Sequence, residues 1–202
     1  MEKNEGSNGK SIKSKKEKGG IPIFKSIRGL CFAGILSAMS IILGKFLQIP
    51  NPFQEFIRIS FENLPIIIGG FALGPIAGGL IGIVADLIGC VLYGYSINPI
   101  ITLGAAAVGL CSGFVYNYVI KKPFIIKIVA STALAHIIGS VLIKSAGLAV
   151  WYLAKYELGY WEFVAWRLLN YVIIGALECT IIYLLFKNSA FKGQIERMCK
   201  GK

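Results

Sequence analysis

The chain has 202 residues, of which 55% are hydrophobic and only 15% are charged, whereas about one quarter of the residues in a soluble globular domain are charged. This composition excludes an ordinary soluble domain and is typical of a protein that crosses the membrane several times. A net charge of +11 would favour nucleic-acid binding in a soluble protein, but here the positions of the cations indicate membrane topology.

The apolar runs predict an all-α integral membrane protein with six transmembrane helices in one compact bundle. The expected spans are residues 24–47, 61–74, 75–93, 98–120, 124–150 and 161–186. Sixteen of the 21 Lys and Arg residues then lie before the first span, between the fourth and fifth, after the sixth, or within the first five residues of the first and fifth spans. By the positive-inside rule, both termini are expected to be cytoplasmic. The expected organisation is a disordered basic tail at 1–20, a membrane domain at 21–188 and a second basic tail at 189–202.

Small residues one helical turn apart mark the first predicted span. Ala33 and Ser37, or Gly34 and Ala38, have this spacing. They let another helix approach closely, because helix association in lipid depends on packing rather than on the hydrophobic effect. The pattern indicates either a contact inside the bundle or a docking face for a partner subunit.

Proline and glycine mark the predicted connections. Residues 48–56 contain two prolines and an asparagine, and are expected to form an external loop. Gly74 and Pro75 divide a long apolar run into two short helices joined by a tight cytoplasmic turn. Residues 93–99 are expected to form the next external turn.

No metal site or cofactor is expected. The five cysteines are widely spaced without a CxxC motif, and His136 is the single histidine, which excludes a multi-histidine metal site. The chain has no GxxxxGK[ST] phosphate loop either. An intramembrane protease would need a Ser/His pair or two aspartates, and a single Asp86 beside a single His136 fits neither arrangement well.

Polar residues recur at helical spacing inside the predicted spans. Residues three or four apart share one face of a helix, and an acid near the middle of a span is so costly that a ligand-binding role is the default hypothesis. The polar residues in question are Asp86 in the third span, Asn98 and Thr102 in the fourth, His136, Ser140 and Lys144 in the fifth, and Arg167, Asn170 and Glu178 in the sixth.

The depth of the charges predicts an anionic ligand. At 1.5 Å per residue, Lys144 and Arg167 lie about 9 Å inside their outer boundaries, and Asp86 reaches a similar level. Two cations then outnumber one acid, and an unpaired buried cation is expensive. The alternative is that Asp86 pairs with one of the two cations only to offset burial. His136 is expected to be a hydrogen-bonded core residue, and Glu178 to serve helix packing or a partner contact.

Four runs of residues carry a family resemblance. They are ISFENLPIIIGGFALGPIAGGLIGIVADLIG, NPIITLGAAAVG, HIIGSVLIKSAGL and WRLLNYVIIGALE. Together they resemble the folate-type substrate-binding S component of energy-coupling factor (ECF) vitamin transporters, and the resemblance extends over about residues 24–186.

The resemblance implies a cell-membrane protein that binds folate or a related vitamin from outside with high affinity and topples in the bilayer to release it inward. Its implied partners are a transmembrane coupling subunit and two ATPase subunits, so this chain would not be an enzyme, and no nucleic acid would bind. The resemblance also implies that the coupling subunit docks on the first span. The usual alanine pair is matched there by Gly34 and Ala38, or is offset to Ala33 and Ser37.

The resemblance further implies a folate site built from the polar residues. Asp86 would accept hydrogen bonds from the pterin amino and ring N–H groups, and a cation would meet the carboxylates through charge-assisted bonds. Amides would fix the ring edges, and an aromatic side chain would stack on the ring. The expected substrate-binding residues are Arg58, Phe61, Asp86, Tyr93, Asn98, Lys144, Trp151, Arg167 and Asn170.

Two alternatives to a folate-binding subunit stay open. One is an S component for another vitamin or precursor, such as pantothenate or a pyrimidine, which would differ only in the pocket. The other is a structural membrane protein, in which the buried charges would serve folding alone.

Overall fold

The computed structural model describes residues 27–47, 49–51, 54–120, 123–149, 159–191 and 193. For residues 49–51 and 54–58 it describes the backbone but not the side chains. The elements in chain order are α1 (Ile27–Phe46), β1 (Ile49–Asn51), β2 (Gln54–Ile59), α2 (Asn63–Leu73), α3 (Pro75–Tyr93), α4 (Pro99–Phe114), η2 (Val115–Val119), α5 (Phe124–Ala135), η3 (His136–Ile143) and α7 (Tyr160–Lys187). The elements η2 and η3 are π-helical continuations of α4 and α5.

Five helices in the described ranges are long and apolar enough to cross a membrane. They span Ile27–Phe46, Pro75–Tyr93, Pro99–Val119, Phe124–Ala149 and Tyr160–Lys187. Their ends lie within three residues of the predicted spans, which confirms a helical protein with multiple membrane crossings. The sides of the membrane on which the termini and turns lie stay predictions.

The second predicted span, residues 61–74, contains α2, which has only 11 residues and is therefore about 16 Å long, against about 30 Å for the hydrocarbon core. It is apolar but shorter than the five helices that can cross a membrane by length and composition. Ten of its 11 residues are buried, so α2 packs inside the bundle. A sixth membrane crossing at this position stays a prediction.

The break between α2 and α3 is confirmed. Gly74 has a φ of 95°, a conformation that side chains disfavour and glycine adopts freely. Pro75 begins α3 at the first helical position, where its missing N–H costs nothing.

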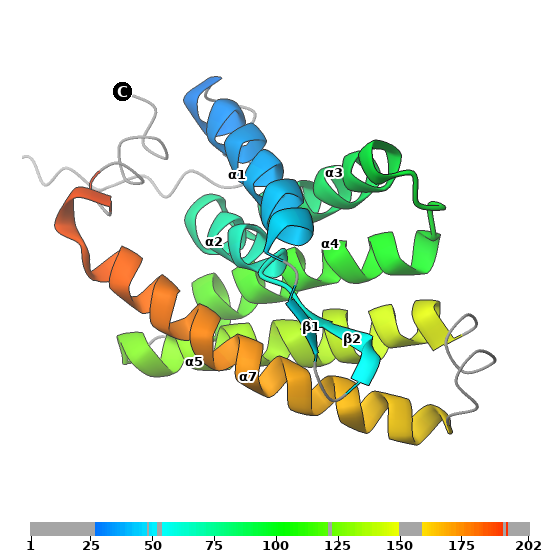
Figure 1. Ribbon diagram of the computed structural model, residues 1–202. Coiled ribbons are helices and arrows are strands. Elements are labelled where there is room, and N and C mark those ends of the chain that lie inside the picture. The colour runs from blue at the N-terminus through cyan, green and yellow to red at the C-terminus, as the bar shows by residue number, and fades with distance from the viewer. Residues whose placement is uncertain are drawn as a thin grey trace, which may run out of the picture.

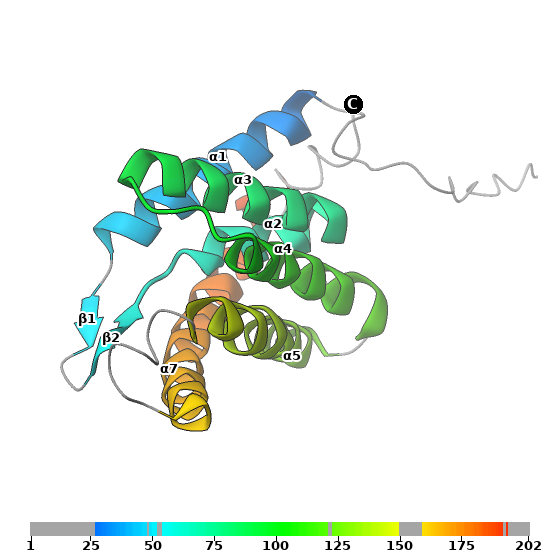
Figure 2. The same ribbon diagram turned by 90° about the vertical axis from the view of Figure 1, so that its right-hand side faces the viewer.

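A short hairpin replaces most of the predicted loop at 48–56. Strands β1 and β2 pair antiparallel, with Ile49 opposite Ile59 and Pro50 opposite Arg58. The membrane protein is helical as predicted, and this small two-stranded sheet is an addition that the sequence did not predict. Figure 2 shows this hairpin at one edge of the bundle beside α7, which contacts β2.

The helices form one bundle around α2. Helices α3, α4 and α5 lie side by side, α1 packs on α2 and α3, and α7 packs on α5 and η3 (Figure 1). Glycines bring α3 and α4 into backbone contact, since a Cβ atom at Gly82 or Gly109 would overlap the backbone of the facing helix. Large apolar side chains such as Leu103 and Leu142 are exposed on the outside, as expected where lipid is the solvent.

The predicted tails lie mostly beyond these elements. Residues 1–20 and 194–202 lie outside the described residues. The boundaries proposed for the tails and the membrane domain therefore stay predictions.

Candidate functional site

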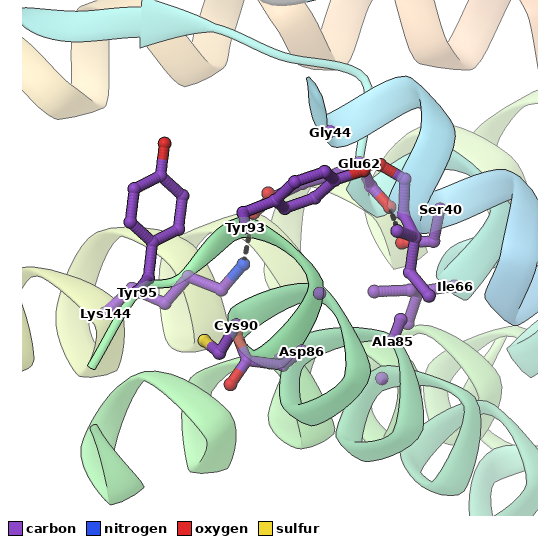
Figure 3. A pocket seen from close by; sticks show the side chains of 14 residues that line it. Ser40, Gly44, Glu62, Ile66, Ala85, Asp86, Cys90, Tyr93, Tyr95 and Lys144 are labelled. Carbon is purple, nitrogen blue, oxygen red and sulfur yellow. Dashed lines mark hydrogen bonds and ion pairs between the residues drawn. The ribbon is translucent and has the colours of Figure 1, made fainter. Parts of the chain in front are cut away.

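A cavity of about 110 Å³ lies where α1, α3 and α4 meet the start of α2 and the end of η3. Along α3 its lining runs from Gly82 to Tyr93, about 16 Å at the helical rise of 1.5 Å per residue. Charged groups line it from three directions: Glu62, Asp86 and Lys144 (Figure 3). The cavity is therefore narrow, elongated and charged.

An ion pair crosses this cavity. The Lys144 Nζ atom donates to Glu62 Oε1 at 2.6 Å and to Asn63 Oδ1 at 3.2 Å. Lys144 is only 5% exposed and Asn63 is 0% exposed. Because a buried ammonium without partners is costly, these two consecutive residues at the start of α2 stabilise Lys144 in the bundle.

A close helix crossing sets the position of Lys144. A Cβ atom at Gly104 in α4 would lie 2.6 Å from Lys144 Cγ and 2.9 Å from the Gly139 carbonyl oxygen in η3. Both distances are shorter than van der Waals contact, so only glycine at 104 lets the lysine stem pass along α4.

The backbone at Glu62 is anchored on both sides. Its carbonyl oxygen accepts a hydrogen bond from Ser40 Oγ in α1 at 2.6 Å, and its N–H donates to Ser60 Oγ at 3.3 Å. The Glu62 side chain makes no capping hydrogen bond to α2. The sequence therefore fixes the main chain here and leaves the carboxylate directed at Lys144.

Asp86 and Tyr93 lie one above the other along α3. Thr102 Oγ1 donates to Asp86 Oδ2 at 2.6 Å, and the Tyr93 hydroxyl donates to the Ile41 carbonyl oxygen at 2.9 Å. The Lys45 Nζ atom lies 5.0 Å from the Tyr93 ring centre, within the range of a cation–π contact. Lys45 thus lies beside the aromatic end of the cavity without lining it.

A second polar cluster lies deeper, between η3 and α7. His136 Nε2 and Glu178 Oε2 are 2.6 Å apart, and both side chains are buried, which confirms that His136 is a hydrogen-bonded core residue. Arg167 donates through Nη2 to the Ser140 carbonyl oxygen at 3.0 Å and lies 5.5 Å from the Tyr171 ring centre. This cluster joins the two helices.

The predicted excess of two buried cations over one acid was wrong. Lys144 pairs with Glu62, an acid that sequence reasoning left without a role, so two cations do not face a single acid. The alternative pairing of Asp86 with Lys144 or Arg167 was also wrong, because Asp86 accepts its hydrogen bond from Thr102. Glu62 was missed because it precedes the apolar run and lies 82 residues from its partner.

The structure gathers three of the predicted substrate-binding residues on the cavity: Asp86, Tyr93 and Lys144. Among the other predicted residues with described side chains, Phe61, Asn98, Arg167 and Asn170 are not part of the cavity lining. The backbone alone is described for Arg58, and Trp151 lies outside the described residues.

Asn98 has a structural task instead. Its Oδ1 accepts from the Ile100 N–H at 3.0 Å and caps α4, while its Nδ2 donates to the Gly147 carbonyl oxygen at 3.0 Å. An N-cap asparagine before proline at the first helical position has a clear sequence signal. The Asn-Pro pair could have assigned Asn98 to the start of the helix.

The two small-residue pairs of α1 face different ways. Ala33 and Ser37 are buried, and Ser37 Oγ donates to the Ala33 carbonyl oxygen at 3.0 Å. Gly34 and Ala38 are exposed, and a Cβ atom at Gly34 would meet nothing within 4 Å. The contact inside the bundle and the outward face therefore belong to different pairs.

These features define an integral membrane protein whose helices enclose a narrow charged site. The chain belongs to the family described as "ECF transporter, substrate-specific component", whose model matches residues 28–188. This match confirms the resemblance seen in the sequence. It also confirms that the chain is a binding component of the cell membrane rather than an enzyme.

The known proteins that it resembles include folate transporters. The folate transporter FolT of Clostridium novyi (strain NT) is 26% identical over 69 residues, which are 34% of this chain and 38% of the relative. The match therefore spans well under half the length of that relative.

Two solved structures share the fold. A crystal structure of FolT bound with folic acid has a TM-score of 0.62 and 22% identity, covering 78% of this chain and 90% of the other. A structure of the S component of a bacterial ECF transporter has a TM-score of 0.60 and 20% identity, covering 78% and 92%.

Proposed function

We propose that this chain is the folate-binding subunit of an ECF-type importer. It captures folate from outside the cell and delivers it inward when it is coupled to a transmembrane coupling subunit and two ATPase subunits. The observation that carries this proposal is a buried Lys144 ammonium on an elongated cavity that Asp86 and Tyr93 also line. The likeness to folate transporters supports the choice of folate.

The chemistry of the cavity suits the two ends of folate. Asp86 Oδ2 accepts from Thr102, whereas Oδ1 accepts no hydrogen bond from the described part of the chain, so we assign it to the N–H groups of the pterin. Lys144 donates to a carboxylate of the glutamate end through a charge-assisted bond. The ring of Tyr93 offers a stacking surface at the cavity wall.

The size of the cavity requires that folate binding widen it. Ligand pockets commonly measure about 300–1,000 Å³, and this cavity measures about 110 Å³. Its length along α3 already suits an extended ligand.

The volume also favours a second candidate, a smaller acidic vitamin such as pantothenate. Such a ligand would place its single carboxylate at Lys144 and need less widening. It would leave the transport mechanism and partners unchanged.

We assign the docking of the coupling subunit to the exposed side of α1. Gly34 and Ala38 lie there one turn apart with open space above Gly34, and small residues let a second helix approach closely. Ala33 and Ser37 pack inside the bundle and are therefore excluded from our assignment.

Ligand titration of the purified full-length protein tests the proposal. Intrinsic fluorescence would be followed during addition of folate, pantothenate and a pyrimidine vitamin, with competition among them. Tight, saturable folate binding that pantothenate does not displace is the expected result. Binding of pantothenate alone would replace folate by the second candidate, and binding of none of the three would overturn both.

A further inference from the structure

We infer that the Glu62 carboxylate occupies the position that a ligand's carboxylate takes at Lys144, and that an acidic ligand binds by displacing it. Glu62 is then an internal competitor that sets the affinity and selectivity of the cavity for acids. This inference deepens the proposed function and rests on it for the identity of the ligand.

The two acceptors of Lys144 differ in how easily they can leave. Asn63 is 0% exposed and is held a second time, because its Nδ2 donates to Ser140 Oγ at 3.2 Å. The Glu62 side chain is 37% exposed, against 6% for that of Lys144. Glu62 thus approaches the ammonium from the open side of the cavity, the side from which a ligand arrives.

The charge of the cavity favours replacement over addition. Its charged lining residues within the described ranges are Glu62, Asp86 and Lys144, which carry a formal net charge of −1, while the Lys45 ammonium lies behind the Tyr93 ring and outside this lining. A further carboxylate would raise the negative charge in surroundings of low dielectric constant, where like charges repel strongly. Exchange of one carboxylate for another at Lys144 leaves the charge unchanged, so the ligand makes this contact at the lowest electrostatic cost when Glu62 leaves it.

The local structure allows this exchange without unfolding. The backbone of Glu62 is held through the hydrogen bonds to Ser40 and Ser60, so only side-chain torsions need change. Glu62 also precedes α2 and lies outside all five membrane-crossing helices. A rotated carboxylate is therefore free to reach water while Asn63 continues to hold Lys144.

The test compares folate with a neutral pterin that has no carboxylate, such as 6-hydroxymethylpterin. Glu62→Gln removes the charge of the competitor and keeps its shape, so folate should bind about tenfold more tightly, as expected for the loss of one competing charge-assisted bond. The neutral pterin should bind as it does to the wild type. Glu162→Gln is the matched control, because Glu162 is an exposed acid in the first turn of α7 and should change neither affinity.

A second variant, Glu62→Asp, tests the same inference with a different substitution. Glu62→Asp retains the charge but shortens the side chain, so it should weaken the contact with Lys144 and raise folate affinity by less than Glu62→Gln does. Thermal unfolding of each purified variant verifies that it is folded.

The possible results separate this inference from the proposed function. Folate binding that is equal or weaker in both Glu62 variants would overturn the inference and leave the folate function standing. An equal gain for the neutral pterin would also overturn it, because competition for Lys144 concerns only acids. Absence of folate binding in the wild type and in every variant would overturn both, whereas binding in Glu62→Gln alone would support the inference.

Discussion

Lys144→Met is the most direct test of the site. Methionine keeps an unbranched stem beside Gly104, where the lysine Cγ packs, and removes the ammonium. A hydrogen bond to a charged group contributes roughly 1.5–3 kcal/mol, which corresponds to a loss of folate affinity of about 10- to 150-fold.

The same substitution affects stability through the groups that Lys144 leaves behind. Asn63 Oδ1, in a side chain that is 0% exposed, loses its donor, which costs about 1–3 kcal/mol. Glu62 loses its counter-charge, but at 37% exposure water solvates part of it. The double variant Lys144→Met, Glu62→Gln should therefore regain some stability without regaining folate binding.

Two measurements separate these effects. Fluorescence titration with folate reports affinity, and thermal unfolding of the purified protein reports stability. Lys187→Met is the control, since Lys187 is an exposed cation in the last turn of α7 and should alter neither. A folded Lys144→Met protein that binds folate as tightly as the wild type would remove Lys144 from the site.

Three other substitutions test the rest of the arrangement. Arg167→Ala removes the hydrogen bond to the Ser140 carbonyl oxygen and should destabilise the protein by about 1–3 kcal/mol. It should lower folate affinity less than Lys144→Met does. A loss of folate affinity at an unchanged unfolding temperature would return Arg167 to the site. Gly104→Ala should destabilise the protein by about 1–3 kcal/mol through overpacking and weaken folate binding by shifting Lys144. Gly34→Ala is its control, because a Cβ atom there has open space. Equal stability and affinity of the two variants would contradict the close packing of Gly104 against Lys144 and Gly139. Gly34→Leu should leave folate titration unchanged and reduce co-purification with the coupling subunit, and undiminished co-purification would move docking to another face.

The membrane-crossing helices could be predicted from the sequence because each is a long apolar run bounded by glycine, proline or charge. Pro75 and Pro99 begin α3 and α4, as their positions in the sequence predict. The run from 61 to 74 could not be classified in this way. Whether an apolar helix faces lipid or protein depends on its neighbours, and α2 is enclosed by α1, α3, α4 and α7.

The site could be predicted in part. Helical spacing placed His136, Ser140 and Lys144 on one face, and all three are buried. The prediction holds although η3 is a π-helix, because its wider turn still keeps residues four apart near one another. The partners of these residues could not be predicted. Glu62 meets Lys144 from 82 positions away, and Glu178 meets His136 from 42, and pairing at such separations follows from tertiary packing rather than from local periodicity.

The hydrogen bonds around Lys144 explain why one side of the cavity is rigid and the other replaceable. From the ammonium a chain runs through Asn63 to Ser140 at 3.2 Å, from Ser140 to His136 at 3.4 Å, and from His136 to Glu178 at 2.6 Å. All of these side chains are buried, so each contact that breaks would leave a polar group unsatisfied in the bundle. A ligand that displaced Asn63 would disturb this chain of hydrogen bonds as far as α7. A ligand that displaces the partly exposed Glu62 carboxylate leaves the chain intact. Binding should therefore displace Glu62 and not Asn63.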